Sequence, residues 1–231
     1  TVKDYFLKFT KLWPLIDDLA KSDLEDVLKA WAGLGYYSRA RNLKKCADEV
    51  VANHHGKFPQ SFEELKKLPG IGDYTASAIA SIAFDEPVAV IDGNIERVMS
   101  RHQRIEAYFP DAKAETKLLL NDILDREKPG EFAQAMMDLG ATICTPKRPA
   151  CGLCPLQNDC QSAHKSDVET YPKKRPKADK PTRKGAAFVL ENQAGEIFLC
   201  KRENEGLLAG MTQVPTTNWT SRQDGETDKS S

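Results

Sequence analysis

Apolar residues in the first part of the chain, from residue 2 to about residue 143, recur three or four positions apart. This spacing gives a helix one apolar face, and no stretch here alternates between apolar and polar residues as a half-buried strand does. The clearest helical segments are expected at 24–31, 75–84, 115–124 and 132–143, and the small apolar residues of 75–84 favour a buried helix. The sequence therefore predicts that this part of the chain is all-α.

Two capping-box patterns mark expected helix starts. Ser22 and Glu25 have the required spacing before one apolar segment, and Ser61 and Glu64 have it before another. In such a box the serine oxygen accepts a hydrogen bond from a free N–H of the first turn. We therefore expect one helix to begin after Ser22 and one after Ser61.

The pattern changes after Cys160. Residues 165–184 are rich in Lys and Pro and have no apolar period, so we predict a linker. Two short β-like runs, 186–191 and 196–202, flank the sequence Asn-Gln-Ala-Gly at 192–195, which predicts a hairpin. Two strands alone do not make a stable domain, so we expect only the start of a second domain here.

These boundaries divide the chain into three parts. Residues 1–164 form the predicted helical region, 165–184 the linker, and 185–231 the partial second domain with a polar, disordered tail. Because the first residues already have a mid-helix pattern, we also expect the natural N-terminus to lie upstream of Thr1.

Composition narrows the class of protein. The chain has 231 residues, 40% of them hydrophobic, and a mean hydropathy of -0.52, which is typical of soluble globular proteins. No apolar run approaches the roughly 20 residues of a membrane span, and no signal peptide opens the chain. A net charge of -1 does not indicate a nucleic-acid partner, but seven basic residues and one acid lie between Lys173 and Lys184. This run is either a solvated linker or a tether that contacts phosphates, and the sequence leaves both open.

Four of the six cysteines lie close together, with the spacing C-x6-C-x2-C-x5-C: Cys144, Cys151, Cys154 and Cys160. Disulfides are disfavoured because the chain has no signal peptide. Four thiolates suit either zinc or an iron–sulfur cluster, and spacing alone does not decide between them. We expect the other two, Cys46 and Cys200, to be core residues.

Three further segments have the residue types of a nucleic-acid site. Leu-Pro-Gly-Ile-Gly at 68–72 lies between two helices, and its two glycines predict a tight turn with positive φ before an anion-binding helix start. Asp92, in Val-Ile-Asp-Gly-Asn-Ile at 90–95, is a helix N-cap or a catalytic carboxylate, and its position alone favours the N-cap. Gly-Leu-Gly-Tyr-Tyr-Ser-Arg-Ala-Arg-Asn at 33–42 is either an exposed turn that touches DNA or an ordinary connection between helices.

Together these motifs resemble the adenine DNA glycosylases of the endonuclease III superfamily, over residues 1 to about 220. The segment 132–141, Phe-Ala-Gln-Ala-Met-Met-Asp-Leu-Gly-Ala, and the 6-2-5 cysteine spacing are part of the resemblance. It implies a mainly α, helix–hairpin–helix glycosylase with a [4Fe-4S] cluster loop. It also implies that Leu207–Pro215 belongs to the start of a NUDIX-like α/β domain.

The resemblance implies roles for individual residues. Asp92 would stabilise an oxocarbenium-like sugar, with Asn94 and Tyr74 as supporting hydrogen-bond groups. Tyr74 stands where bifunctional relatives have a Schiff-base lysine, so it implies a monofunctional enzyme. Tyr36 would wedge beside the damaged guanine. The remaining DNA contacts would come from Gly70, Gly72, Lys147 and Arg148, and the cluster would be held by Cys144, Cys151, Cys154 and Cys160.

The implied function is base excision repair: hydrolysis of adenine mispaired with 8-oxoguanine or guanine in double-stranded DNA, leaving an abasic site. The alternatives are an endonuclease III-like glycosylase-lyase for oxidised pyrimidines, or a non-catalytic DNA-binding fragment. The second alternative arises because the family's general-acid glutamate would precede Thr1 and its Phe-Ser-His loop would follow Ser231, so we expect these residues alone to bind DNA but to cleave slowly. We further expect a monomer without a membrane partner, cytoplasmic and nucleoid-associated if the source is bacterial.

Overall fold

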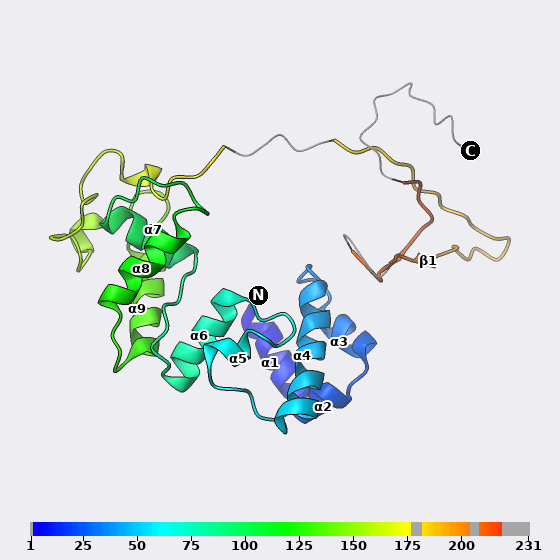
Figure 1. Cartoon of the computed structure of the whole chain (residues 1–231). Helices are drawn as coiled ribbons and strands as arrows, with labels where there is room; N and C mark the ends of the chain where they lie inside the picture. Colours follow the sequence, from blue (N-terminus) through cyan, green and yellow to red (C-terminus); the bar gives the residue numbers. More distant parts are fainter. Residues whose placement is uncertain (1, 177–181, 204–207, 219–231) are drawn as a thin grey trace.

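The computed structural model describes residues 2–176, 182–203 and 208–218 (Figure 1). Its helices confirm the all-α prediction for the first part of the chain. They are α1 Val2–Leu12, α2 Ile16–Lys21, α3 Leu24–Trp31, α4 Ser38–His54, α5 Phe62–Leu65, α6 Asp73–Phe84, α7 Gly93–His102, α8 Lys113–Ile123 and α9 Pro129–Thr142. Short 3-10 turns follow at Cys151–Leu153 and Val168–Thr170. None of the helices in the described ranges is long and apolar enough to cross a bilayer.

The helices form two groups that share α6. In the first group, α2 and α3 pack against α4, and α5 packs against α6; in the second, α9 packs against both α6 and α7. The first core includes Val50 and Leu65, and the second includes Ile95 and Met99. α6 can lie between them because it is built from small side chains and because α9 approaches it closely at Gly130, where a Cβ atom would lie 2.7 Å from the Ser81 carbonyl oxygen.

One of the two predicted capping serines is confirmed. Ser61 is the N-cap of α5, and its hydroxyl accepts a hydrogen bond from the Glu64 N–H at 3.4 Å. The prediction for Ser22 is wrong. Asp23 occupies the N-cap of α3, while Ser22 ends α2 and donates its hydroxyl to the Leu19 carbonyl at 2.7 Å. The Ser22 hydroxyl, which the pattern assigned to the start of α3, therefore bonds to the end of α2 instead.

In the C-terminal part, β1 Cys200–Lys201 pairs antiparallel with β2 Thr212–Gln213. The predicted turn at 192–195 forms, with a single bridge between Glu191 and Ile197, but its flanking segments do not form the expected ladder. A NUDIX-like domain remains a prediction. The predicted tail, 221–231, and the basic residues Lys177 and Lys180 lie outside the described residues.

Candidate functional site

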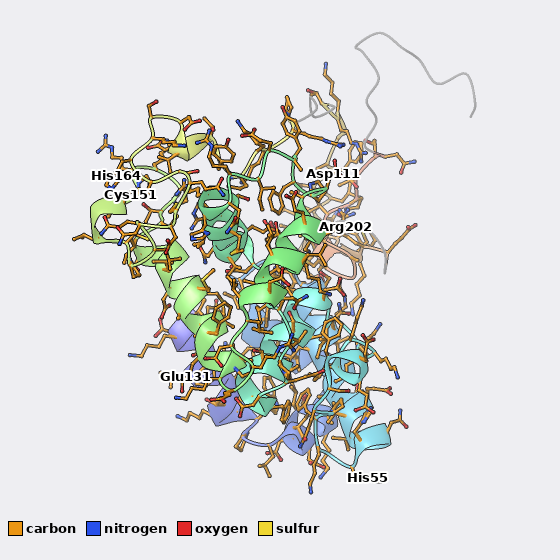
Figure 2. All side chains as sticks on the ribbon, turned by 60° about the vertical axis from the view of Figure 1, so that its left-hand side comes forward. His55, Asp111, Glu131, Cys151, His164 and Arg202 are labelled. Carbon is orange, nitrogen blue, oxygen red and sulfur yellow. The ribbon has the colours of Figure 1, made fainter. Side chains whose placement is uncertain are left out.

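The four clustered cysteines line one small cavity at the end of α9. None of them forms a disulfide, and the rest of the lining is mostly apolar: Ile143, Pro149, Ala163 and Val168, with Gln157. The loop carrying Cys151 lies at one end of the molecule (Figure 2). A small, mostly apolar cavity lined by four free thiols suits an inorganic cofactor.

Four free thiols that line one cavity fit either of the two groups that their spacing indicates, a zinc ion or an iron–sulfur cluster. Both groups bind cysteine as the thiolate, so the donor set suits either one.

Positive charge and N–H groups surround two of these thiols. The Arg101 Nη1 lies 3.4 Å from the Cys144 Sγ, and its guanidinium also donates to the carbonyls of Thr145 and Pro146 at 2.7 and 3.0 Å. Arg101 is only 1% exposed. Burial raises the pKa of the Cys160 thiol, and hydrogen bonds from two backbone N–H groups after it act in the opposite direction. Such donors stabilise thiolate charge, which is the form that binds iron.

The same loop exposes the two basic residues expected to meet DNA. Lys147 and Arg148 are both exposed, and Arg148 has a left-handed backbone with φ of 50°. Its N–H donates to the Glu169 carboxylate at 2.8 Å. The loop thus holds two cations at the surface next to the cluster cavity.

Asp92 is the N-cap of α7, as its position predicts. Its Oδ1 accepts hydrogen bonds from the N–H groups of Asn94 and Ile95 at 2.9 and 2.7 Å, and the Asn94 amide donates to its Oδ2 at 3.0 Å. The carboxylate is half-buried and lies at the positive end of the helix. Capping does not exclude catalysis, because a fixed carboxylate is also what a charged transition state requires.

A connection between this carboxylate and the cysteine loop was not predicted. Arg97 donates to the Asn94 side-chain oxygen at 2.8 Å, to the Gly140 carbonyl at 2.6 Å and to the Cys144 carbonyl at 2.7 Å. Burial lowers the pKa of Arg97. The sequence signal was present but missed: Arg97 and Arg101 are four residues apart and therefore share one face of a helix with an apolar core side.

The structure does not bring Tyr74 against Asp92. The Tyr74 hydroxyl instead lies 4.0 Å from the Met137 sulfur. Tyr74 is 45% exposed and lines a cavity of about 250 Å³ together with Ile91, the neighbour of Asp92. One turn along α7, burial raises the pKa of Glu96, and the nearby Asp92 charge adds to the shift.

Only one of the two hairpin glycines has the expected backbone. Gly70 has φ of 78°, and a Cβ atom there would lie 2.5 Å from the Asn42 Cβ. Gly72 has φ of -92° and open space around it, so positive φ is wrong for this position. Gly72 is the N-cap of α6 and has no capping side chain, which leaves the first N–H groups of that helix open to an anion.

The turn before α4 holds Tyr36 away from the protein. Tyr36 has φ of 46° and is 78% exposed, and Gly35 before it has φ of 68°. The Trp31 indole fixes the turn by donating to the Gly35 carbonyl at 2.9 Å, and the Arg39 guanidinium lies 5.6 Å from the Tyr36 ring. The segment is therefore both a connection between helices and an exposed aromatic tip.

Part of the predicted basic tether is already paired within the protein. Lys173 lies 3.7 Å from the Glu106 carboxylate, and Arg175 forms an ion pair with Asp111, which is labelled in Figure 2. Both cations therefore already have a carboxylate partner within the protein. Instead, residues 165–176 pack against the helical region.

Comparison with known families agrees with this geometry. Residues 1–124 match the HhH-GPD superfamily of base excision DNA repair proteins, and residues 144–160 match the iron–sulfur binding domain of endonuclease III. The second match begins and ends on the outer cysteines. The chain therefore carries a [4Fe-4S] cluster, and the four thiols are the groups that would hold it.

Individual curated relatives are adenine DNA glycosylases. The chain is 35% identical to the human adenine DNA glycosylase, with 95% of the chain and 49% of that protein aligned, and 38% identical to the Arabidopsis thaliana adenine DNA glycosylase, with 94% and 40% aligned. It thus spans about half the length of the first curated relatives. An adenine DNA glycosylase of Buchnera aphidicola subsp. Schizaphis graminum is 34% identical, with 99% of the chain and 68% of that protein aligned.

Two solved structures are similar to the fold. A thermostable thymine-DNA glycosylase has a TM-score of 0.65 at 28% identity, with 70% of this chain and 76% of that chain covered. A non-covalent endonuclease III–DNA complex has a TM-score of 0.61 at 27% identity, with 70% and 75% covered. The chain belongs to the HhH-GPD superfamily of base excision DNA repair proteins and, within it, to the adenine DNA glycosylases.

Proposed function

We propose that the protein binds double-stranded DNA and hydrolyses the N-glycosidic bond of adenine mispaired with 8-oxoguanine or guanine. The observation that carries the proposal is the anchored carboxylate of Asp92, which is held by two backbone N–H groups and the Asn94 amide. A carboxylate fixed beside the sugar stabilises the oxocarbenium-like transition state that loss of the base generates.

The other residues act on DNA around this carboxylate. The open helix start after Gly72 receives a backbone phosphate, and the exposed Lys147 and Arg148 attract the phosphates further along. The Tyr36 ring fills the stack when the base leaves it. When bound, the cluster cross-links four thiolates and so fixes the loop that carries the two cations. We assign no general acid among the described residues.

Replacing Asp92 by residues that also cap helices tests its role. Asn and Ser are N-caps of similar quality to Asp, so Asp92→Asn and Asp92→Ser keep the cap and remove the charge. We expect both to lower the single-turnover rate on an adenine:8-oxoguanine duplex by about 100-fold or more, while DNA binding is retained. Glu115→Gln, which removes an exposed carboxylate from the first turn of α8, is the matched control. Full activity in both Asp92 variants would show that the residue is only a cap.

The proposed enzyme is monofunctional, because a phenol at position 74 cannot form a Schiff base with the sugar. Borohydride treatment during turnover should therefore trap no protein–DNA adduct. The same assay on duplexes with an oxidised pyrimidine tests the alternative, a glycosylase-lyase. Efficient trapping on those duplexes would favour that alternative.

A further inference from the structure

The segment that follows the last cysteine continues to surround the cluster cavity. We call residues 161–175 the cluster strap. Val168, in the 3-10 turn Val168–Thr170, lines the cavity together with the four cysteines, and so does Ala163. Figure 2 labels Cys151 of the cysteine loop and His164 of the strap, and the two lie at the same end of the molecule. The matched iron–sulfur domain ends at residue 160, so this wall belongs to residues outside it.

Several contacts hold the strap in place on either side of Val168. Before it, the Gln161 N–H donates to the His102 carbonyl at 2.9 Å, and the Arg104 guanidinium makes two hydrogen bonds with Asp167 at 3.1 and 2.7 Å. After it, the Glu169 carboxylate accepts from the Arg148 N–H at 2.8 Å, which ties the strap to the cysteine loop itself. Val168 is thus fixed between two anchors.

A second set of contacts holds the strap at Tyr171, which is 1% exposed. Its carbonyl accepts from the Arg101 Nε at 3.3 Å, and its hydroxyl donates to Glu106. The Arg104 guanidinium and the Lys173 ammonium both lie over its ring, 4.9 and 4.6 Å from the centroid. Since Arg101 also reaches the Cys144 sulfur, one buried side chain joins the strap to a cluster ligand.

We propose that the cluster strap is part of the cofactor site. Val168 forms the side of the cavity that keeps water from the cluster, and the Arg104–Asp167 pair and Tyr171 hold Val168 in that position. Cluster loss requires a chelator or oxidant to reach the iron and the thiolates. A strap that opens more often exposes them more often, so the strap contacts set the rate at which the cofactor is lost.

Iron release from the whole chain tests this. Loss of the visible absorbance of the cluster and capture of iron by a chelator are followed without denaturant, in Asp167→Asn and in Val168→Ala. A partly exposed ion pair is worth a small energy, so we expect Asp167→Asn to release iron about two- to fivefold faster. Val168→Ala should accelerate release by at least as much, because it opens the wall directly. Asp159→Asn is the matched control, since it removes a carboxylate from the cysteine loop itself without touching the strap.

A double-mutant cycle separates the pair from general destabilisation. If Arg104 and Asp167 act together, Arg104→Gln should accelerate release less in the Asp167→Asn background than in the parent, and what remains is the contribution of the Arg104 contact with the Tyr171 ring. The helical signal on heating shows whether each variant is as stable as the parent. Release at the parental rate in folded, iron-loaded Asp167→Asn and Val168→Ala would overturn the proposal, and so would equal acceleration in Asp159→Asn.

Discussion

Three of the hydrogen bonds that Arg97 donates join three separate parts of the site. It donates to the side chain of Asn94, which holds Asp92, and to the backbone carbonyls of Gly140 in α9 and of Cys144. Gly140 makes this possible, because a Cβ atom there would lie 2.6 Å from the Asn94 Cβ and would push α7 away from α9. A change at Arg97 or Gly140 should therefore alter the positions of both the Asp92 carboxylate and the cysteine loop.

Arg97→Lys tests this connection. Lysine keeps the charge but lacks the planar fork, so the bonds to Asn94 and Gly140 should not both survive. Because hydrogen bonds to charged groups are the stronger ones, we expect a loss of about 2 kcal/mol in the free energy of unfolding, measured with urea. Arg126→Lys, at an exposed position, should change it little. An unchanged midpoint for Arg97→Lys would show that water replaces these bonds.

The residues of the candidate site were predictable to different degrees. The four cysteines could be found from their spacing, because thiolates that share a metal centre must be close in sequence or held by a tight loop. Asp92 could be found as an N-cap from local chemistry alone, but its catalytic role rested on the family resemblance. The contact of Tyr74 with Met137 could not be predicted, since it joins residues 63 positions apart on α6 and α9.

At the scale of elements, the helices were the predictable part. Periodic apolar faces located α6 and α9 closely, since local pattern and burial agree there. The capping pattern at Ser22 failed because two helices compete for one hydroxyl, and sequence alone does not show which helix uses it. The predicted strands were longer than those in the structure, because β-pairing depends on which segment lies alongside. Residues 200–201 pair with 212–213 and not with 186–191, the run that precedes the turn at 192–195.

The two glycines of the hairpin should separate stability from DNA binding. Gly70→Ala places a side chain in a left-handed backbone and against Asn42, so we expect it to lower the free energy of unfolding by at least about 1–2 kcal/mol. Gly72→Ala meets no such steric conflict and should cost less, at most about 1 kcal/mol, because alanine is only the poorer N-cap. If a phosphate approaches the backbone at Gly72, however, the added methyl group should weaken binding to an abasic-site analogue. Urea unfolding and a DNA titration at fixed salt give the two quantities, and equal stability of the two variants would contradict the backbone argument.

At the scale of the whole molecule, a hydrogen bond between described residues joins the helical region to the C-terminal segment. The Arg41 Nη1, from α4, donates to the Ala209 carbonyl at 2.9 Å. Ala209 is only 3% exposed, although its neighbour Leu208 is about half exposed. Leu208 and Gly210 both have positive φ, with values of 58° and 69°, so the turn presents the Ala209 carbonyl to the helix. Arg41 lies five residues beyond Tyr36, so the C-terminal segment touches the helix that follows the exposed aromatic tip.

Arg41→Gln should loosen this turn without harming the helices. Arg41 donates outward from α4 and is not part of either core, so the urea midpoint should change little. The amide of Gly210, which donates to the Glu203 carbonyl at 2.9 Å, and that of Met211, which donates to Leu208 at 3.2 Å, should exchange with solvent faster, because the turn loses its fixed partner. A loss of one hydrogen bond to a charged group predicts an acceleration of roughly tenfold. Lys45→Gln, one turn further along the same helix, is the control and should leave both amides unchanged. Unchanged exchange in Arg41→Gln would mean that the turn is held by its own hydrogen bonds and not by Arg41.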